Sequence, residues 1–279
     1  MAREPERIGI VAGGGALPRL LAKAAERGGL APFIVTLDGV ASPNDFSRWP
    51  GQPMPALALA RIATLLREAG CRRVVLAGHL PRPDLAALIR DRLGRRVLPG
   101  AMLAALRGDG ALLDLLAKVV EGEGFVLEGV QALAPELLAG AGALGRLSPR
   151  AEHFMDVRLA AAAALRQGRR QRGQGAIARA GRLLGVEDVA GTDALLARTP
   201  PAGPQRSGVL VKRPRPGQDP RLDLPAIGPD TVARAAAAGL AGVVVAASAA
   251  LVIGPEETAR AADEAGLFVF GASEQELDG

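Results

Sequence analysis

Short apolar runs alternate with longer segments of helical periodicity along the first half of the chain. The apolar runs predict buried strands at Arg7–Ala12, Pro32–Leu37, Arg72–Ala77, Arg95–Leu98 and Phe125–Glu128. The segments between them predict helices at Ala16–Arg27, Ala56–Ala69, Pro83–Leu93 and Gly110–Glu121. Strands separated by helices of this length are typical of a parallel, doubly wound sheet.

The second half begins after a glycine- and alanine-rich stretch, Gly129–Gly145, which we interpret as a hinge between domains. Its apolar pattern predicts strands at Ala176–Ala180, Leu183–Glu187, Gly208–Lys212, Gly242–Ala246, Ala250–Ile253 and Leu267–Phe270. Helices are predicted at Ala151–Arg166, Pro229–Ala238 and Glu256–Ala265. The fold class is therefore α/β, with one domain at 1–132 and a second α/β domain at 148–279.

The most apolar stretch of the chain, Ala238–Gly254, is close to the short limit for a membrane-spanning helix. Three consecutive valines are followed by small residues and then by a second apolar run. Two short buried strands with a tight connection explain this pattern better than one helix does.

Composition indicates a globular protein of a reducing compartment. The chain has 279 residues, of which 49% are hydrophobic, and this is enough for a substantial core. Cys71 is the single cysteine, so the chain has no internal disulfide and a cytoplasmic location is the natural interpretation. Nucleic acid is not an expected partner, because the net charge is only +5 and aromatic residues make up just 3%.

A triple glycine, Gly13, Gly14 and Gly15, lies between the first predicted strand and the first predicted helix. Backbone N–H groups at such a turn bind phosphates, and the helix N-terminus adds partial positive charge. Asp38 follows at the end of the second strand, as in dinucleotide-binding proteins. An NAD-dependent oxidoreductase is therefore one alternative, although Pro18 replaces the third glycine of that motif.

The loop after the third predicted strand contains His79 and Arg82. Ligands of open α/β sheets gather at the carboxyl ends of strands, so this loop is expected beside the triple glycine. Both side chains are candidates for contacts with a phosphate or a sugar. The structural alternative is an ordinary helix entry with Pro83 in the first turn.

Polar residues gather at two glycine-containing turns of the second half. Gln174 lies between two glycines, and Thr192 and Asp193 follow Gly191. Together with Glu187 they supply amide, hydroxyl and carboxylate groups for a phosphate or a hard cation. Alternatively, Thr192 or Asp193 simply caps a helix at Ala194–Arg198.

The segment from Lys212 to Gly228 concentrates charge in a backbone stiffened by prolines, which exclude a continuous helix or a central strand. Its cations include Lys212, Arg215 and Arg221, and its carboxylates are Asp219 and Asp223. Cations of this kind bind phosphate oxygens, and carboxylates bind a divalent metal or orient an attacking water. The alternative is a charged, solvated linker between domains.

The chain resembles the LpxI family, the UDP-2,3-diacylglucosamine pyrophosphatases of lipid A biosynthesis. The segments that carry the resemblance follow one another along the chain: Ala12–Pro18, Ala77–Asp84, Arg107–Asp109, Gly173–Ala176, Gly191–Leu195 and Val209–Gly228. The resemblance implies a Rossmann-like N-terminal domain and magnesium-dependent hydrolysis to UMP and 2,3-diacylglucosamine 1-phosphate. The essential aspartate of the family's D-L-P-T-I-G segment corresponds to Asp223. Two positions depart from the family pattern, since Ala226 replaces a threonine and Ala190 replaces a glutamate.

These observations give one set of expected site residues. Asp223, Lys212 and Arg221 are the catalytic candidates, and Asp223, Asp219 and Glu187 are the candidate ligands of Mg²⁺. Substrate binding is assigned to Gly13, Gly14, Gly15, His79, Arg82, Gln174, Thr192, Asp193 and Arg215. The resemblance implies a UDP-linked diacylated glucosamine as substrate. Peripheral contact with the inner membrane and a homodimer stay open, as does a non-catalytic protein that binds a nucleotide or a lipid.

Overall fold

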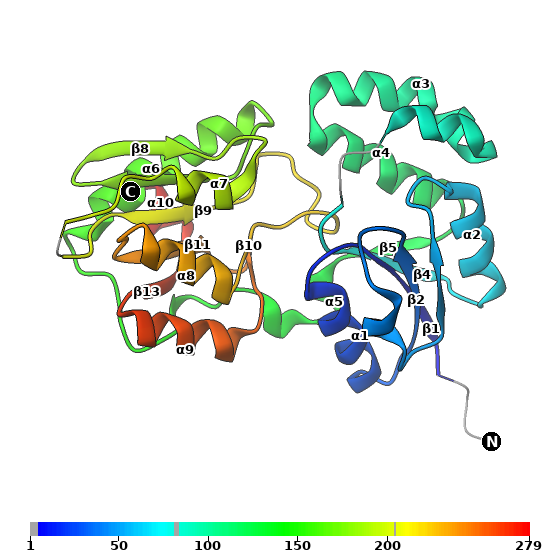
Figure 1. The fold of residues 1–279 in the computed structure, drawn as a ribbon, viewed down its shortest axis with the longest axis horizontal. Helices are drawn as coiled ribbons and strands as arrows, with labels where there is room; N and C mark the ends of the chain where they lie inside the picture. Colours follow the sequence, from blue (N-terminus) through cyan, green and yellow to red (C-terminus); the bar gives the residue numbers. More distant parts are fainter. Residues whose placement is uncertain (1–4, 81–83, 204) are drawn as a thin grey trace. The chain divides into compact units, whose positions relative to one another are not determined.

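The computed structural model describes residues 5–80, 84–203 and 205–279, and Figure 1 labels many of its helices and strands. The chain divides into two structural units. Unit 1 consists of Met1–Pro135 together with Asp219–Asp223, and unit 2 consists of Glu136–Gln218 and Leu224–Gly279. The domains expected from the sequence leave Asp219–Asp223 in the second half, whereas the structure groups this short segment with unit 1.

Unit 1 is built on a five-stranded parallel sheet in the order β3-β2-β1-β4-β5. The strands are β1 (Arg7–Ala12), β2 (Ala31–Leu37), β3 (Gly51–Met54), β4 (Arg73–Ala77) and β5 (Val126–Glu128). Ile10 of β1 lies between Ile34 of β2 and Val75 of β4, and all three side chains are buried. This strand order is that of a Rossmann fold, so the predicted fold class is confirmed.

Helical segments lie between these strands, as expected for parallel neighbours, and two more follow β5. They are α1 (Leu17–Arg27), α2 (Leu59–Glu68), α3 (Arg92–Arg107), α4 (Asp109–Gly122) and α5 (Val130–Leu133), with 3-10 helices η1 (Pro43–Phe46), η2 (Leu85–Arg90) and η3 (Pro135–Leu137). Helix α1 buries Leu21, Ala22 and Ala25 on one face. It ends at Arg27 with Gly28 as its C-cap, and Gly29 then adopts a φ of +78°, which a side chain would disfavour.

Two sequence predictions in unit 1 are wrong. The expected strand Arg95–Leu98 is part of the long helix α3, and the expected helix Pro83–Leu93 is a 3-10 helix, η2, followed by the start of α3. Asp91 separates the two because its carboxylate accepts a hydrogen bond from Gly94 N–H at 2.8 Å and so caps α3. Strand β3 was not predicted from the sequence. It lies at the edge of the sheet, where Pro53, which has no N–H to donate, is tolerated.

Unit 2 contains a mixed six-stranded sheet in the order β6-β13-β11-β9-β7-β8 and a separate parallel pair, β10 with β12. The strands are β6 (Gly142–Ala143), β7 (Gly175–Arg179), β8 (Arg182–Val186), β9 (Val209–Lys212), β10 (Ala226–Ile227), β11 (Gly242–Ala246), β12 (Leu251–Val252) and β13 (Phe268–Ala272). Strands β9, β11 and β13 are parallel, whereas β7 runs antiparallel to β8 and β9.

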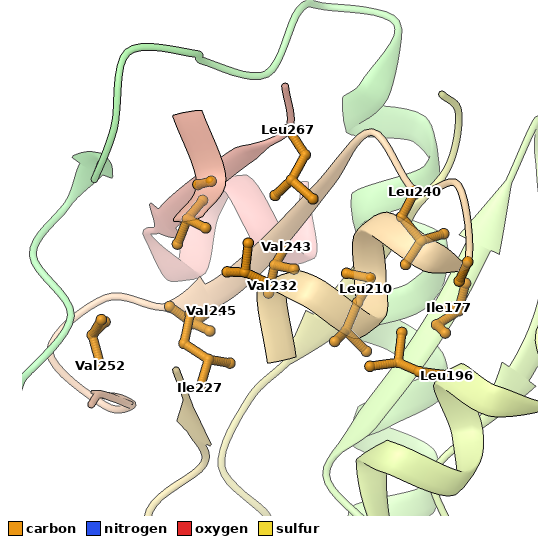
Figure 2. Packing of buried hydrophobic residues seen from close by; sticks show 14 of the residues in the cluster. Ile177, Leu196, Leu210, Ile227, Val232, Leu240, Val243, Val245, Val252 and Leu267 are labelled. Atoms are coloured by element: carbon orange, nitrogen blue, oxygen red, sulfur yellow. The ribbon is translucent and has the colours of Figure 1, made fainter. Parts of the chain in front are cut away.

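Alternating side chains give the sheet of unit 2 two buried faces. On one face Ile177, Leu210 and Val243 pack with α7 (Gly191–Ala197), α8 (Pro229–Ala237) and α9 (Pro255–Ala265), as Figure 2 shows. On the other face Ala176 and Val211 pack against α6 (His153–Arg169), and Leu277 of α10 (Glu274–Asp278) joins this cluster. Unit 2 is therefore an α/β domain with helices on both faces of its sheet.

The apolar stretch 238–254 forms two strands, β11 and β12, as the sequence predicted. Val243, Val244 and Val245 are all buried in the sheet. Within the described part of the chain, no helix is long and apolar enough to cross a membrane.

Candidate active site

The two loops that were expected to meet in unit 1 do meet. Strands β1 and β4 are neighbours at the point where the strand order reverses, and each is followed by one of these loops. Gly13 N–H donates to the Ala77 carbonyl at 2.8 Å. Gly14 and His79 exchange two hydrogen bonds of 2.8 Å, so the loops are joined by a short antiparallel bridge.

Close backbone approach explains why glycines occupy these loops. A Cβ on Gly13 would lie 2.5 Å from the His79 carbonyl oxygen, and one on Gly78 would lie 2.5 Å from the Gly14 oxygen. The N–H groups of Gly13 and Gly14 therefore hold the two loops together and are not directed at a ligand. Within the described residues, the Gly15 N–H makes no hydrogen bond, and Gly15 is exposed.

Unit 2 gathers four of the expected site residues around a buried ion pair. Lys212, the last residue of β9, has its Nζ 4.0 Å from Glu187 Oε2, and their side chains are only 8% and 10% exposed. The same Glu187 oxygen accepts a hydrogen bond from Thr192 Oγ1 at 2.8 Å. Lys212 Nζ also donates to the backbone carbonyl of Ala226 at 3.1 Å. Each charge is thus compensated, which a buried ion pair requires.

The β7 end of this cluster is shaped by a glycine. Gly175 pairs with Lys212 across the β7–β9 ladder, and a Cβ on it would lie 2.6 Å from Glu187 Oε2. The neighbouring Gln174 accepts a hydrogen bond at its backbone carbonyl from Arg213 N–H at 3.0 Å. Its side-chain oxygen is buried and has no hydrogen-bond partner among the described residues. We call Gln174, Glu187, Thr192 and Lys212 the buried cluster.

A charged turn, Asp219–Asp223, forms the part of unit 1 contributed by the second half of the chain. The guanidinium of Arg221 donates to both oxygens of Asp219, with Nη2 to Oδ2 at 2.7 Å, and its Nη1 donates to Glu121 of α4 at 2.7 Å. These side-chain hydrogen bonds lower the pKa of the Asp219 carboxyl from its ordinary value and raise that of Arg221. Both groups therefore stay charged over a wide pH range.

Packing also holds this turn on unit 1. Leu222 lies against the core cluster that includes Leu76, Ala117 and Leu127. Asp223 follows directly, is half-buried, and donates its backbone N–H to the Asp219 carbonyl at 3.3 Å. The backbone that presents the Asp223 carboxylate is thus fixed by contacts on its N-terminal side.

The remaining expected residues have varied surroundings. The backbone N–H of Arg215 donates to Gln218 Oε1 at 3.0 Å, within the segment from Lys212 to Gly228. Asp193 is largely exposed and forms an ion pair of 3.4 Å with Arg234 of α8, outside the hydrogen bonds of the buried cluster. Arg82 lies outside the described residues. The His79 side chain is exposed, whereas its backbone forms the bridge to Gly14.

The expected metal ligands do not form a ready-made metal site. In residues 5–80, 84–203 and 205–279, no three histidine, cysteine, aspartate or glutamate side chains are grouped to hold an ion. Asp219 is bound by Arg221, and Glu187 by Thr192 and Lys212. Magnesium commonly takes one or two carboxylates and completes its shell with waters and phosphate oxygens. A single carboxylate of this kind fits an ion that is shared with a phosphorylated substrate, not a site built from protein side chains alone.

Comparison with known proteins identifies the family. The LpxI N-terminal domain family matches residues 7–137, and the LpxI C-terminal domain family matches residues 140–270. The chain belongs to the LpxI family. A relative from Caulobacter vibrioides, named UDP-2,3-diacylglucosamine pyrophosphatase LpxI, is 42% identical over 277 residues, which are 97% of this chain and 99% of the relative. The resemblance inferred from the glycine turns and the charged loop is thereby confirmed.

Two groups that complete the buried cluster were not predicted from the sequence: the backbone carbonyl of Ala226 and the side-chain amide of Gln167. The Ala226 carbonyl accepts from Lys212, and Gln167 Nε2 donates to the Glu187 carbonyl at 3.1 Å. The Ala226 contact uses a backbone oxygen, so it does not depend on the side chain at this position, where the resemblance implies a threonine. At Ala190, the other departure, the backbone N–H donates to Asp188 Oδ1 at 2.9 Å in a local turn. Only the glycine pattern around Gln174 signalled close packing at this point.

Proposed function

We propose that this chain hydrolyses the diphosphate of UDP-2,3-diacylglucosamine and releases UMP and 2,3-diacylglucosamine 1-phosphate. The observation that supports this proposal is the match to both LpxI domains and to a relative that carries that name over nearly the full length of both chains. At this level of identity, motif residues in the same order are expected to serve the same reaction.

Asp223 is the residue to which we assign the reaction. Hydrolysis of a diphosphate requires neutralised phosphate charge and an oriented water, and a carboxylate serves either purpose. Bound Mg²⁺ would supply Lewis-acid stabilisation of the phosphate oxygens. The Asp223 carboxylate would hold this ion together with the substrate, because Asp223 matches the essential aspartate of the family's motif.

Two of the cations that we expected on the phosphates have structural partners, and this suggests positioning roles for them. Three residues after Asp223, the Ala226 carbonyl accepts a hydrogen bond from Lys212. Two residues before Asp223, Arg221 donates to Glu121. We propose that these contacts fix the backbone on either side of Asp223. Arg215, Gly15 and His79 remain our candidates for contacts with phosphate or sugar, and Gln174 contributes its buried amide.

The substrate class implies where the protein works. A diacylated sugar nucleotide has its acyl chains in a lipid phase and its nucleotide in water, so we propose that the chain acts in the cytoplasm and makes peripheral contact with the inner membrane. The homodimer considered above is a separate question, for which sedimentation velocity is the direct measurement.

The decisive test of this function is release of UMP from UDP-2,3-diacylglucosamine in detergent micelles, followed by chromatography with Mg²⁺ or with EDTA. We expect both products in equal amounts, with turnover lost in EDTA and restored by added Mg²⁺. Asp223→Ala should retain the unfolding temperature of the wild type and lose most turnover. A folded wild-type protein that binds the substrate without releasing UMP would instead indicate a binding protein.

A further inference from the structure

Helix α3 exposes three large apolar side chains on its last two turns. Met102 is 58% exposed, Leu103 61% and Leu106 85%. The other large apolar residues exposed in the described chain lie elsewhere: Ile89 in η2, then Val126, Leu147, Met155, Leu183 and Val189. A group of this kind on one helix marks an interaction surface more often than scattered single residues do.

The same face of α3 is strongly cationic. At 100° per residue, the three apolar side chains and three exposed arginines of α3 fall within one arc of about 120°: Arg92, Arg95, Arg96, Met102, Leu103 and Leu106. The opposite face buries Gly94, Ala101 and Ala104. The sole acid between residues 85 and 108 is Asp91, which is buried at 8% exposure and caps the helix. No exposed carboxylate in this segment therefore offsets the arginines.

We propose that this face of α3 docks on the surface of an anionic lipid bilayer. Helices that lie in the membrane interface combine exposed apolar side chains with arginines or lysines, which attract anionic headgroups. Met102, Leu103 and Leu106 would enter the interface while Arg92, Arg95 and Arg96 contact headgroup phosphates. The biological purpose of this docking rests on the proposed function, because a lipid-linked substrate resides in such a surface.

A second copy of the chain fits this face less well. In a two-fold symmetric contact the same surface meets itself, so a contact centred on the first turns of α3 would bring the arginines of one copy against those of the other. The segment offers no exposed carboxylate to compensate them. Anionic lipid provides the complementary charge and accepts the apolar side chains at the same time.

Co-sedimentation with vesicles tests the proposal. We expect the wild type to bind phosphatidylcholine vesicles that contain phosphatidylglycerol, and to bind pure phosphatidylcholine weakly. The variant M102Q/L103Q/L106Q should bind the anionic vesicles at least about tenfold more weakly. R92Q/R95Q/R96Q should also lose about tenfold or more, together with most of the dependence on salt. The matched control L147Q/M155Q/L183Q removes three exposed apolar side chains outside α3 and should bind as the wild type does.

Several outcomes would overturn the proposal. Wild-type protein that stays in the supernatant would do so, as would equal binding by the wild type and both α3 variants. Self-association of the wild type without lipid, lost in M102Q/L103Q/L106Q, would assign this face to a second copy. Circular dichroism establishes that each variant is folded. UMP release from micellar substrate should be unchanged in all variants, so a failure of docking is distinguishable from a failure of the proposed reaction.

Discussion

The loops at the strand ends of unit 1 and the buried cluster of unit 2 were both expected to bind phosphate, and they are built in different ways. In unit 1 the interactions are between backbone groups: Gly13 and Gly14 use their N–H groups to join the loops after β1 and β4. In unit 2 they are between side chains, because Lys212 and Thr192 both contact the same carboxylate oxygen of Glu187. Similar glycine-containing motifs therefore serve close approach in one unit and the packing of buried charge in the other.

The difference shows where charge is available for chemistry. The unit 1 loops present a shaped backbone with little charge, whereas Lys212 and Arg213 of unit 2 are already paired with the carboxylates of Glu187 and Asp278. The charged turn Asp219–Asp223 differs from both, because Arg221 engages Asp219 and thereby holds the backbone of the neighbouring Asp223. We infer that most charged residues between Lys212 and Gly228 position the backbone, and that few of them contact substrate.

Lys212→Met should have the largest effect on stability. It leaves Glu187 as a buried carboxylate without its cation and removes the hydrogen bond to Ala226. We expect a loss of about 3–5 kcal/mol in the free energy of unfolding, measured in urea. The double variant Glu187→Gln with Lys212→Met should regain part of it, because the orphaned charge is gone. Equal stability of Lys212→Met and the wild type would show that the cluster is solvated and not buried.

Thr192→Val probes the same cluster with a smaller change. It keeps the shape of the side chain and removes the hydroxyl that donates to Glu187 at 2.8 Å. A hydrogen bond to a charged group contributes about 1.5–3 kcal/mol, and we expect a loss in that range in the same urea titration. Thr192→Ser restores the hydroxyl and should recover most of the lost stability. Equal losses in Thr192→Ser and Thr192→Val would attribute the effect to packing.

Gly13→Ala tests the backbone arrangement of unit 1. The added Cβ would lie 2.5 Å from the His79 carbonyl, so the two loops must separate. We expect a loss of about 1–3 kcal/mol in the free energy of unfolding. Gly122→Ala is the matched control, at the end of α4. A Cβ added there would meet no atom of another segment within 4 Å, so this substitution should be neutral or slightly stabilising. If the two substitutions behave alike, the loops are not in close contact.

The ion pair of the charged turn should make a small, pH-dependent contribution. Hydrogen bonds from Arg221 lower the pKa of Asp219, so its contribution to stability is present above the unfolded pKa and is lost as the pH falls through the folded pKa. Because the pair is partly exposed, we expect less than about 1 kcal/mol. The difference in unfolding temperature between the wild type and Asp219→Asn should be constant from about pH 7 to 5 and shrink below about pH 4. A difference that grew on acidification would contradict this assignment.

The alternating pattern was sufficient to predict most of the architecture, because buried parallel strands and amphipathic helices differ in their period. Helix α3 was missed because Gly94, Pro99 and Gly100 weaken its helical propensity, while Arg95–Leu98 resembles a short strand. Packing against α4 and the cap at Asp91 decide the outcome, and neither is visible in the local pattern.

The sequence was sufficient to predict which residues belong to the candidate site, but not which of them contact one another. Polar residues at the ends of short strands identified Glu187, Thr192 and Lys212. Their association depends on the register of β7 with β9, which places Gly175 opposite Lys212 and is set by tertiary pairing. The inclusion of Asp219–Asp223 in unit 1 depends on a contact between residues far apart in the sequence, Arg221 and Glu121.

The most direct test of our central claim is UMP release from UDP-2,3-diacylglucosamine, measured side by side for the wild type, Asp223→Asn and Asp219→Asn. If Asp223 serves the reaction and Asp219 positions the turn, Asp223→Asn should lose on the order of 1,000-fold in turnover or more. Asp219→Asn should keep a turnover within about tenfold of the wild type, because an amide oxygen still accepts from Arg221. Comparable activity of Asp223→Asn and the wild type, in folded proteins, would contradict the account.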